Sequence, residues 1–255
     1  MVFNRVIPCL LLHQGGLAKT VKFKKPNYIG DPINAVKIFN DKEVDELIFL
    51  DIDATVEGRE PNYKLIEEIA SECFIPLCYG GGVTSIEQMK KIFALGVEKI
   101  SLSAKAIESP ELIKEASELF GSQSVVVVLD IKKSFWGGRY SIYTHRGKKN
   151  RKLEPIEFAK KIVNMGAGEL VINSIDNDGQ MQGYDSELLK MIKEAVDIPV
   201  IGLGGAGSLE DMRRVIKNIG VSATAAGSLF VYQGALNAVL INYPEYKKIR
   251  ELLKD

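Results

Sequence analysis

Short apolar runs alternate with amphipathic stretches along the whole chain. The apolar runs are rich in Val, Ile and Leu, a composition typical of parallel strands that are buried on both faces. Eight of them are predicted strands, at residues 5–12, 46–53, 75–79, 99–103, 124–131, 169–174, 199–202 and 222–226. Helical patterns lie between these strands. Eight strand–helix units indicate either a closed barrel or a doubly wound sheet.

Two of the predicted helices carry start signals. The run 85–88, Ser-Ile-Glu-Gln, has the form of a capping box, in which a serine and a side chain three residues later cap backbone N–H groups reciprocally. Pro110 follows Ser109 and is expected at the first helical position, where a missing N–H group leaves no hydrogen bond unmade.

An internal repeat decides between barrel and open sheet. Residues 45–53 align with residues 168–176, and residues 81–89 align with residues 204–212. Each second copy follows the first by 123 residues, as from Glu46 to Glu169. A period of about half the chain indicates two four-unit halves that close into an eight-stranded barrel. We therefore predict a single (β/α)8 TIM barrel over residues 1–255, duplicated internally, with halves of about 1–120 and 121–255.

The composition of the chain narrows the classes of function to be considered. Lys and Arg together number 33, as do Asp and Glu, so the zero net charge provides no electrostatic argument for nucleic acid or an anionic membrane. No apolar run is long enough to span a bilayer, and the N-terminus lacks a signal-peptide layout. Cys9, Cys73 and Cys78 have no metal-type spacing and are expected to be reduced core thiols of a cytoplasmic protein. With two histidines in the chain we expect no metal site, and we expect no cofactor.

Two polar stretches interrupt the strand–helix rhythm. Residues 15–28 are expected to form a polar loop after the first strand, and residues 134–152 form a longer basic insertion after the fifth. The alternation at residues 140–143 is compatible with a small hairpin. Both stretches follow the carboxyl ends of strands, where barrels build their sites. Each Lys or Arg in them is equally compatible with an ordinary solvated loop.

Paired glycine-rich turns are the strongest local signal. Residues 80–82 and 204–207 each follow a strand and open a helix, and each half adds a second strand end with small residues, 101–104 and 225–228. Glycine lets backbone N–H groups approach a phosphate closely, and a helix N-terminus adds a favourable dipole. A single glycine-rich turn would more often reflect only the backbone conformation that the turn requires. Two copies related by the repeat favour a ligand with two phosphate groups.

Acidic residues also follow predicted strands: Asp51, Asp53, Asp130, Asp176 and Asp178. A carboxylate at a strand end faces the substrate and can act as a general acid or base. Asp130 ends the apolar run 125–129 and is expected at the cavity mouth. For Asp51, Asp53 and Asp176, loop capping is at least as well supported.

Four charged residues begin strands at the opposite end: Arg5, Glu46, Lys99 and Glu169. Two cations and two anions could form a closed ion ring across the barrel bottom. Such residues are ordinarily solvated strand ends or stabilising pairs, and composition alone favours that interpretation.

The chain resembles a known family over essentially its whole length. The motifs at residues 5–10, 45–51, 80–83, 166–169 and 204–207 are similar, in order and spacing, to those of the cyclase subunit of imidazole glycerol phosphate synthase. The resemblance implies a glutamine amidotransferase in which a glutaminase docks on the N-terminal face of the barrel. Ammonia then crosses the barrel to a phosphorylated small molecule, a ribonucleotide bisphosphate, at the top.

The resemblance also assigns roles to residues. The four strand-start residues fall on the positions of an ammonia gate, and Asp130 falls on one of two catalytic aspartates. Lys19 falls on a lysine of a mobile active-site loop. The candidate substrate- and phosphate-binding residues are Lys19, Gly82, Ser103, Asp178, Gly179, Gly205, Gly227 and Ser228.

The second catalytic aspartate is replaced by Leu11, which cannot transfer a proton. One positioned acid or base typically contributes roughly 10²–10⁴ in rate. Ser103 and Leu203 also differ from the residues usual in the biosynthetic cyclase. The chain thus resembles a divergent branch in its runs 8–12, 15–23 and 240–244. That branch is associated with acetamidino modification of surface polysaccharide sugars, and it implies a further partner, an ATP-dependent sugar amidotransferase.

Four functional interpretations follow from these observations. The first is an ammonia-channelling subunit for sugar amidination, which leaves open whether the chain performs chemistry of its own. The second is a working cyclase of histidine biosynthesis that uses Asp130 with a substitute for the missing acid, Asp51 or Asp176. The third is the related barrel isomerase, against which the run 166–169 speaks. The fourth is a non-enzymatic binder of phosphorylated metabolites.

Overall fold

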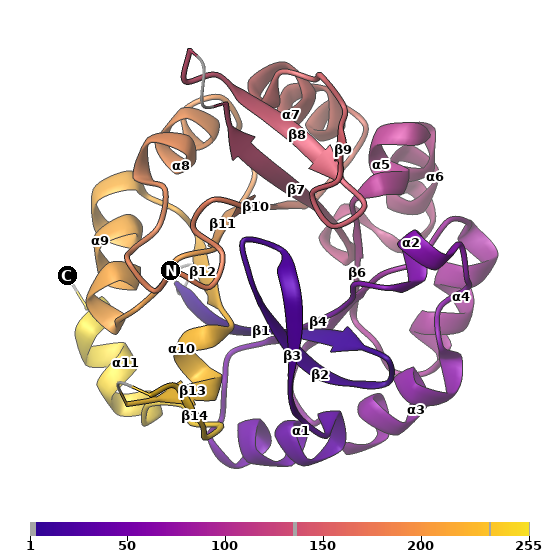
Figure 1. Cartoon of the computed structure of the whole chain (residues 1–255). Coiled ribbons are helices and arrows are strands. Elements are labelled where there is room, and N and C mark those ends of the chain that lie inside the picture. The colour runs from indigo at the N-terminus through magenta and orange to yellow at the C-terminus, as the bar shows by residue number, and fades with distance from the viewer. Residues whose placement is uncertain (1–3, 135–136, 235, 255) are drawn as a thin grey trace.

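The fold is a closed barrel of eight parallel strands surrounded by helices, seen end-on in Figure 1. The computed structural model describes residues 4–134, 137–234 and 236–254. The barrel strands are β1 (Arg5–His13), β4 (Leu47–Asp51), β5 (Leu77–Gly80), β6 (Lys99–Leu102), β7 (Val125–Lys133), β10 (Glu169–Ser174), β11 (Val200–Leu203) and β12 (Ala223–Ala226). They pair in the order β10-β11-β12-β1-β4-β5-β6-β7, and β7 pairs with β10 to close the ring. The predicted (β/α)8 barrel is confirmed, and the doubly wound alternative is excluded.

Helices and short hairpins connect the barrel strands. The helices are α1 (Pro32–Asp41), α2 (Ala54–Glu57), α3 (Tyr63–Glu72), α4 (Ile86–Ala94), α5 (Ala104–Glu108), α6 (Glu111–Phe120), α7 (Pro155–Asn164), α8 (Ser186–Lys193), α9 (Leu209–Ile219), α10 (Ser228–Val231) and α11 (Tyr246–Leu253), with a 3₁₀ turn at Ser122–Ser124. The remaining strands are β2 (Gly16–Val21), β3 (Lys24–Gly30), β8 (Tyr140–Thr144), β9 (Lys149–Asn150), β13 (Tyr232–Gln233) and β14 (Ala238–Val239). No described helix is long and apolar enough to cross a membrane.

The strand predictions hold to within two residues at each end. β10 has the predicted bounds, whereas β5 begins at Leu77, two residues later than predicted. Pro76 explains this delay, because proline has no N–H group to donate to a neighbouring strand. Its carbonyl nevertheless accepts a hydrogen bond from the N–H of Leu47, 2.9 Å away.

The two helix-start predictions need small corrections. Ser85 caps α4 by accepting a hydrogen bond from the N–H of Gln88, as expected. The Gln88 carboxamide, however, accepts from the N–H of Thr84 at 2.7 Å, so the cap is not the reciprocal box. Pro110 is the N-cap of α6 and lies one position earlier than predicted, with a φ of −59° that already suits a helix.

Matching hydrogen bonds recur in the two halves of the barrel. The N–H of Gln14 donates to Asp53 Oδ2 at 2.9 Å in the first half. The N–H of Lys133 donates to Asp176 Oδ2 at 2.9 Å in the second. In each case a carboxylate after one strand holds the end of the neighbouring strand. The sequence repeat therefore corresponds to a repeat of local geometry.

Both insertions are β-hairpins that rise from the mouth of the barrel. The prediction of a loop at residues 15–28 was wrong, because β2 pairs with β1 and β3. This hairpin is anchored against the barrel by four consecutive buried residues of β2, residues 17–20. β8 pairs with both β7 and β9, which agrees with the hairpin interpretation of the second insertion. Residues 135 and 136 of that insertion lie outside the described residues.

The barrel interior is mostly apolar. Its buried cluster consists of Ile7, Cys9, Ile48, Cys78, Val126, Val128, Val171, Ile201, Ala223 and Ala225. A second and larger cluster fills the layer between strands and helices. Cys9 and Cys78 are free thiols in the interior, and Cys73 is a free thiol at the end of α3. Among the described residues, no group of three or more His, Cys, Asp and Glu side chains is arranged to hold a metal ion.

Candidate functional site

A cavity of about 480 Å³ lies at the carboxyl ends of the barrel strands. It is lined by every residue predicted for catalysis or ligand binding: Asp130, Lys19, Gly82, Ser103, Asp178, Gly179, Gly205, Gly227 and Ser228. Leu11 and Leu203 also line it. The four residues predicted for the gate do not. The barrel thus separates two groups of candidate residues, one at each end.

Asp130 is an ionisable residue of the cavity lining, near the end of β7. Asn173 donates a hydrogen bond from Nδ2 to Asp130 Oδ1 over 2.9 Å. Burial raises the pKa of Asp130 to about 7, and the neighbouring charge of Asp178 acts in the same direction. A carboxyl group with that pKa exchanges its proton near neutral pH, which suits either a general acid or a general base.

Leu11 contributes an alkyl side chain where β1 approaches the cavity. The resemblance placed a second catalytic carboxylate at this position. Leucine neither accepts nor delivers a proton, so position 11 cannot supply a second acid beside Asp130.

Lys19 lies on β2 and is buried at the cavity wall. Its Nζ donates to the carbonyl oxygen of Cys9 at 3.2 Å, and burial lowers the pKa of its ammonium group. A Cβ atom at position 227 would overlap Lys19 Nζ, so Gly227 makes room for this cation. Lys19 therefore lies directly beside the second small-residue strand end, 225–228.

The glycine turns are required by packing as well as by any ligand. Gly82 has a φ of +73°, and a Cβ there would lie 2.8 Å from that of Ala54. Gly205 has a φ of +110°, and a Cβ there would overlap the carbonyl of Gly183. Larger residues are thus excluded at both positions. Binding of phosphate by these turns remains a prediction.

Asp178 holds the first hairpin over the cavity. Its Oδ2 accepts hydrogen bonds from Thr20 Oγ1 at 2.7 Å and from the N–H of Phe23 at 3.1 Å. Its backbone carbonyl accepts from the N–H of Lys22 at 3.0 Å. Asp178, a candidate ligand-binding residue, is therefore also the anchor of the hairpin that covers the site.

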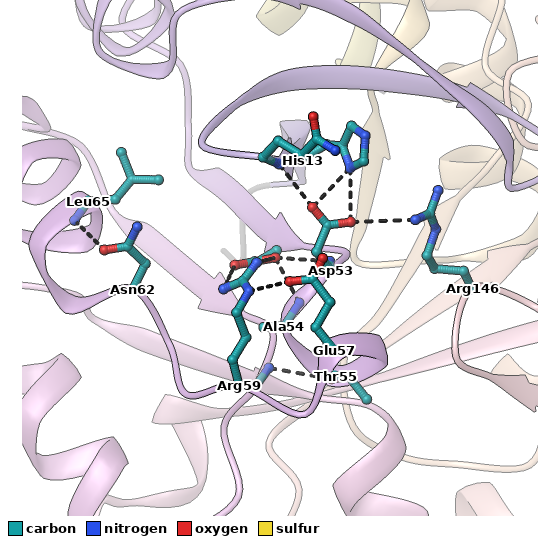
Figure 2. Close-up of polar contacts among 12 residues, drawn as sticks. His13, Asp53, Ala54, Thr55, Glu57, Arg59, Asn62, Leu65 and Arg146 are labelled. Carbon is teal, nitrogen blue, oxygen red and sulfur yellow. Dashed lines mark hydrogen bonds and ion pairs between the residues drawn. The ribbon is translucent and has the colours of Figure 1, made fainter.

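Asp51 and Asp53 act as loop caps, an interpretation that the sequence supported at least as well as a catalytic role. Asp51 Oδ1 accepts from the N–H groups of Asp53 and Ala54, and Arg59 pairs with the Asp51 carboxylate at 3.1 Å. Figure 2 shows Asp53 beneath His13, whose Nδ1 lies 2.9 Å from each carboxylate oxygen. Although burial opposes ionisation, the bonds from Gln14 and His13 hold the pKa of Asp53 below its usual range.

Three cations of the cavity lining, Arg59, Lys105 and Arg146, were not identified from the sequence. Arg59 follows α2, and Arg146 lies in the turn between β8 and β9. Neither belongs to a motif. For Arg146, its place in a basic insertion after a strand end was the available signal.

The four strand-start residues form a closed ion ring at the bottom of the barrel. Arg5 reaches Glu46 and Glu169 at 2.5 Å each, and Lys99 reaches the same two glutamates at 2.9 Å each. Burial disfavours the charged forms, but the glutamates outweigh it and raise the pKa values of both cations. Every member thus contacts two partners of opposite charge. Its action as an ammonia gate remains a prediction.

These features define a (β/α)8 barrel with a cavity at one end and a charged ring at the other. The chain belongs to the family of histidine biosynthesis proteins, whose model matches residues 5–237, and within it to the HisF group. The family-level expectation from the sequence is thereby confirmed.

Three relatives illustrate the match. A protein of Pseudomonas aeruginosa named "Putative imidazole glycerol phosphate synthase subunit hisF2" is 53% identical over 249 residues, covering 98% of this chain and 99% of the relative. A similarly named hisF3 protein of Vibrio vulnificus is 51% identical, covering 99% and 98%. The imidazole glycerol phosphate synthase subunit HisF of Chlorobaculum tepidum is 41% identical, covering 91% and 92%.

Proposed function

We propose that this barrel is the ammonia-receiving subunit of a glutamine amidotransferase system that serves acetamidino-sugar formation in surface polysaccharides. A glutaminase would dock on the N-terminal face and release ammonia at the ion ring. The observation that carries the proposal is the intact ring combined with Leu11 in the cavity. The bottom of the barrel has all four ring residues, whereas the cavity at the top has leucine at position 11, where cyclase chemistry would use an acid.

The interior supports passage of a small neutral molecule. The side chains between ring and cavity are almost all apolar, and two of them are the small alanines 223 and 225. An apolar path admits neutral ammonia more readily than ammonium, because burying an unpaired charge is costly. Ammonia would therefore remain unprotonated until it reached the polar cavity.

The upper face would then deliver ammonia to a partner. In this proposal a separate ATP-dependent amidotransferase activates the sugar substrate, and the barrel supplies its nitrogen. A phosphorylated small molecule in the cradles would control the site. The chain itself then needs no second catalytic acid, which accounts for Leu11.

Activation of the glutaminase tests the proposal. Adding the barrel to its glutaminase should raise glutamine hydrolysis, because subunit docking completes the complex. Glu98 is exposed beside the ring, so Glu98→Lys should weaken the activation, whereas Glu115→Lys on the outer face of α6 should not. No activation at any subunit ratio would overturn the proposal.

A second candidate, a working cyclase of histidine biosynthesis, is favoured by Asp130. Its pKa of about 7 is suitable for proton transfer without a second carboxylate. Turnover of the cyclase's ribonucleotide bisphosphate substrate with excess ammonium salt separates the candidates, because the salt bypasses the glutaminase. Turnover that disappears in Asp130→Asn would establish a cyclase. No turnover by the natural protein, followed by gain of activity in Leu11→Asp, would support the conduit.

A further inference from the structure

Arg146 has an unusual position at the mouth of the cavity. It lies in the turn between β8 and β9, where His145 and Arg146 have φ values of +55° and +57°. Non-glycine residues seldom adopt this left-handed conformation, and those that do often lie at functional sites. The turn carries the Arg146 side chain to the cavity wall.

The guanidinium of Arg146 is oriented but largely unpaired. Its Nη1 lies 3.4 Å from Asp53 Oδ1, as the dashed line in Figure 2 shows. Within the described residues this is the only hydrogen bond or ion pair that Arg146 forms. Asp53 is itself fixed by His13 and Gln14. The other N–H groups of Arg146 are therefore available to a ligand while a buried carboxylate positions the side chain.

Arg146 lines the same cavity as the first glycine cradle, residues 80–82, and is connected to it through Asp53. Asp53, its partner, is followed directly by Ala54 and Thr55. Gly82 packs against Ala54, and the N–H of Gly82 lies 3.4 Å from Thr55 Oγ1. A segment of three residues thus connects the arginine to the backbone of the cradle. Lys105, next to the strand end 101–104, is a further cation of the cavity lining.

We propose that Arg146 is an anion-binding residue that completes the first cradle for one phosphate group of the ligand. The second cradle supports this assignment by comparison, because there Lys19 from the first hairpin lies against Gly227. Each hairpin would then supply one cation to one cradle. An arginine can bind phosphate with two parallel hydrogen bonds, which makes it more selective for that group than a lysine.

Arg59, the other arginine of the cavity, does not fit this role. It pairs with Asp51 at 3.1 Å and with Glu57 at 2.6 Å, so two carboxylates neutralise it. Arg146 contacts a single carboxylate through one nitrogen at the longer distance of 3.4 Å. Of these two arginines, Arg146 is the one whose charge is available to a ligand.

Calorimetric titration with inorganic phosphate, at constant ionic strength, tests the proposal. The natural protein should bind two phosphates, one in each cradle. Arg146→Gln should weaken one of the two by about tenfold or more, since hydrogen bonds to charged groups are the strong ones. Arg139→Gln is the matched control, because Arg139 is an exposed arginine of the same insertion that does not line the cavity. Lys19→Gln should weaken the other phosphate, and the two effects should add in the double variant.

Two outcomes would overturn the proposal: no phosphate binding by the natural protein, or equal binding by Arg146→Gln and Arg139→Gln. Unchanged thermal unfolding of Arg146→Gln would exclude misfolding as the cause of a loss. The titration uses neither glutaminase nor glutamine. The titration can therefore disprove the role of Arg146 without disproving ammonia transfer. In the same way, the glutaminase assay can disprove ammonia transfer without disproving the role of Arg146.

Discussion

The two ends of the barrel use charged residues differently. At the bottom, Arg5 and Lys99 each contact both Glu46 and Glu169, and the four formal charges cancel. At the top, Lys19 bonds to a backbone carbonyl, and Asp130 bonds to an amide. The bottom is a completed network, whereas at the top Lys19 and Asp130 form no ion pair with any other described residue.

This difference separates closure from binding. A buried charge network resists the removal of any one member, because the remaining charges lose their partners. A site for an ionic ligand needs the opposite arrangement, in which charge is held in place but left unneutralised. Substitutions at the bottom should therefore lower the stability of the fold most. Substitutions at the top should instead change how stability depends on pH and how firmly the first hairpin covers the cavity.

The largest effect is expected for Arg5→Met. This change leaves Glu46 and Glu169 with Lys99 as their ring cation, and breaking a buried ion pair costs about 3 kcal/mol or more. Urea unfolding should show a lower midpoint. Lys114→Met removes an exposed pair with Glu118 at 3.9 Å and should change stability by less than about 0.5 kcal/mol. Equal midpoints for the two variants would show that the ring contributes no more than surface pairs.

A smaller, pH-dependent effect is expected for Asp130→Asn. The raised pKa of about 7 means that ionisation of Asp130 is less favourable in the folded chain than in the unfolded one. Its penalty is absent at low pH, grows as pH rises above the unfolded value of about 4, and levels off above about 7. The asparagine variant escapes this penalty. Its stability relative to the natural protein should increase by about 2.5 kcal/mol between pH 5 and pH 8.

Thermal unfolding at several pH values measures this effect. Asn173 can still donate to an asparagine oxygen, so the local hydrogen bond is retained. Asp197→Asn on the surface is the control and should leave the pH profile unchanged. A constant difference between Asp130→Asn and the natural protein from pH 5 to pH 8 would contradict the burial of this carboxyl group.

The sequence predicted the barrel because its signals are local and repeated. Apolar runs set each strand, and the copies at Glu46 and Glu169 revealed the two halves. The site was predicted as far as residues lie at strand ends, as Asp130 and Gly205 do. Arg146 was missed because its position depends on the β8–β9 turn and on Asp53, which is 93 residues away in sequence. The first hairpin was missed because its lysines suggested a solvated loop, whereas Lys19 is buried.

The smallest effect is expected for Thr20→Val, which tests how the first hairpin is held. Valine keeps the shape of threonine but removes the hydrogen bond to Asp178, one of the few that fasten this hairpin over the cavity. Local opening should become about tenfold more frequent, because a hydrogen bond to a charged group is lost. Amide hydrogen exchange at Lys22 and Phe23, which both donate to Asp178, should accelerate accordingly. Thr144→Val in the second hairpin should leave these two amides unchanged. If both variants exchange at the natural rate, the hairpin is held by packing of β2, and the top of the barrel is more rigid than its hydrogen bonds indicate.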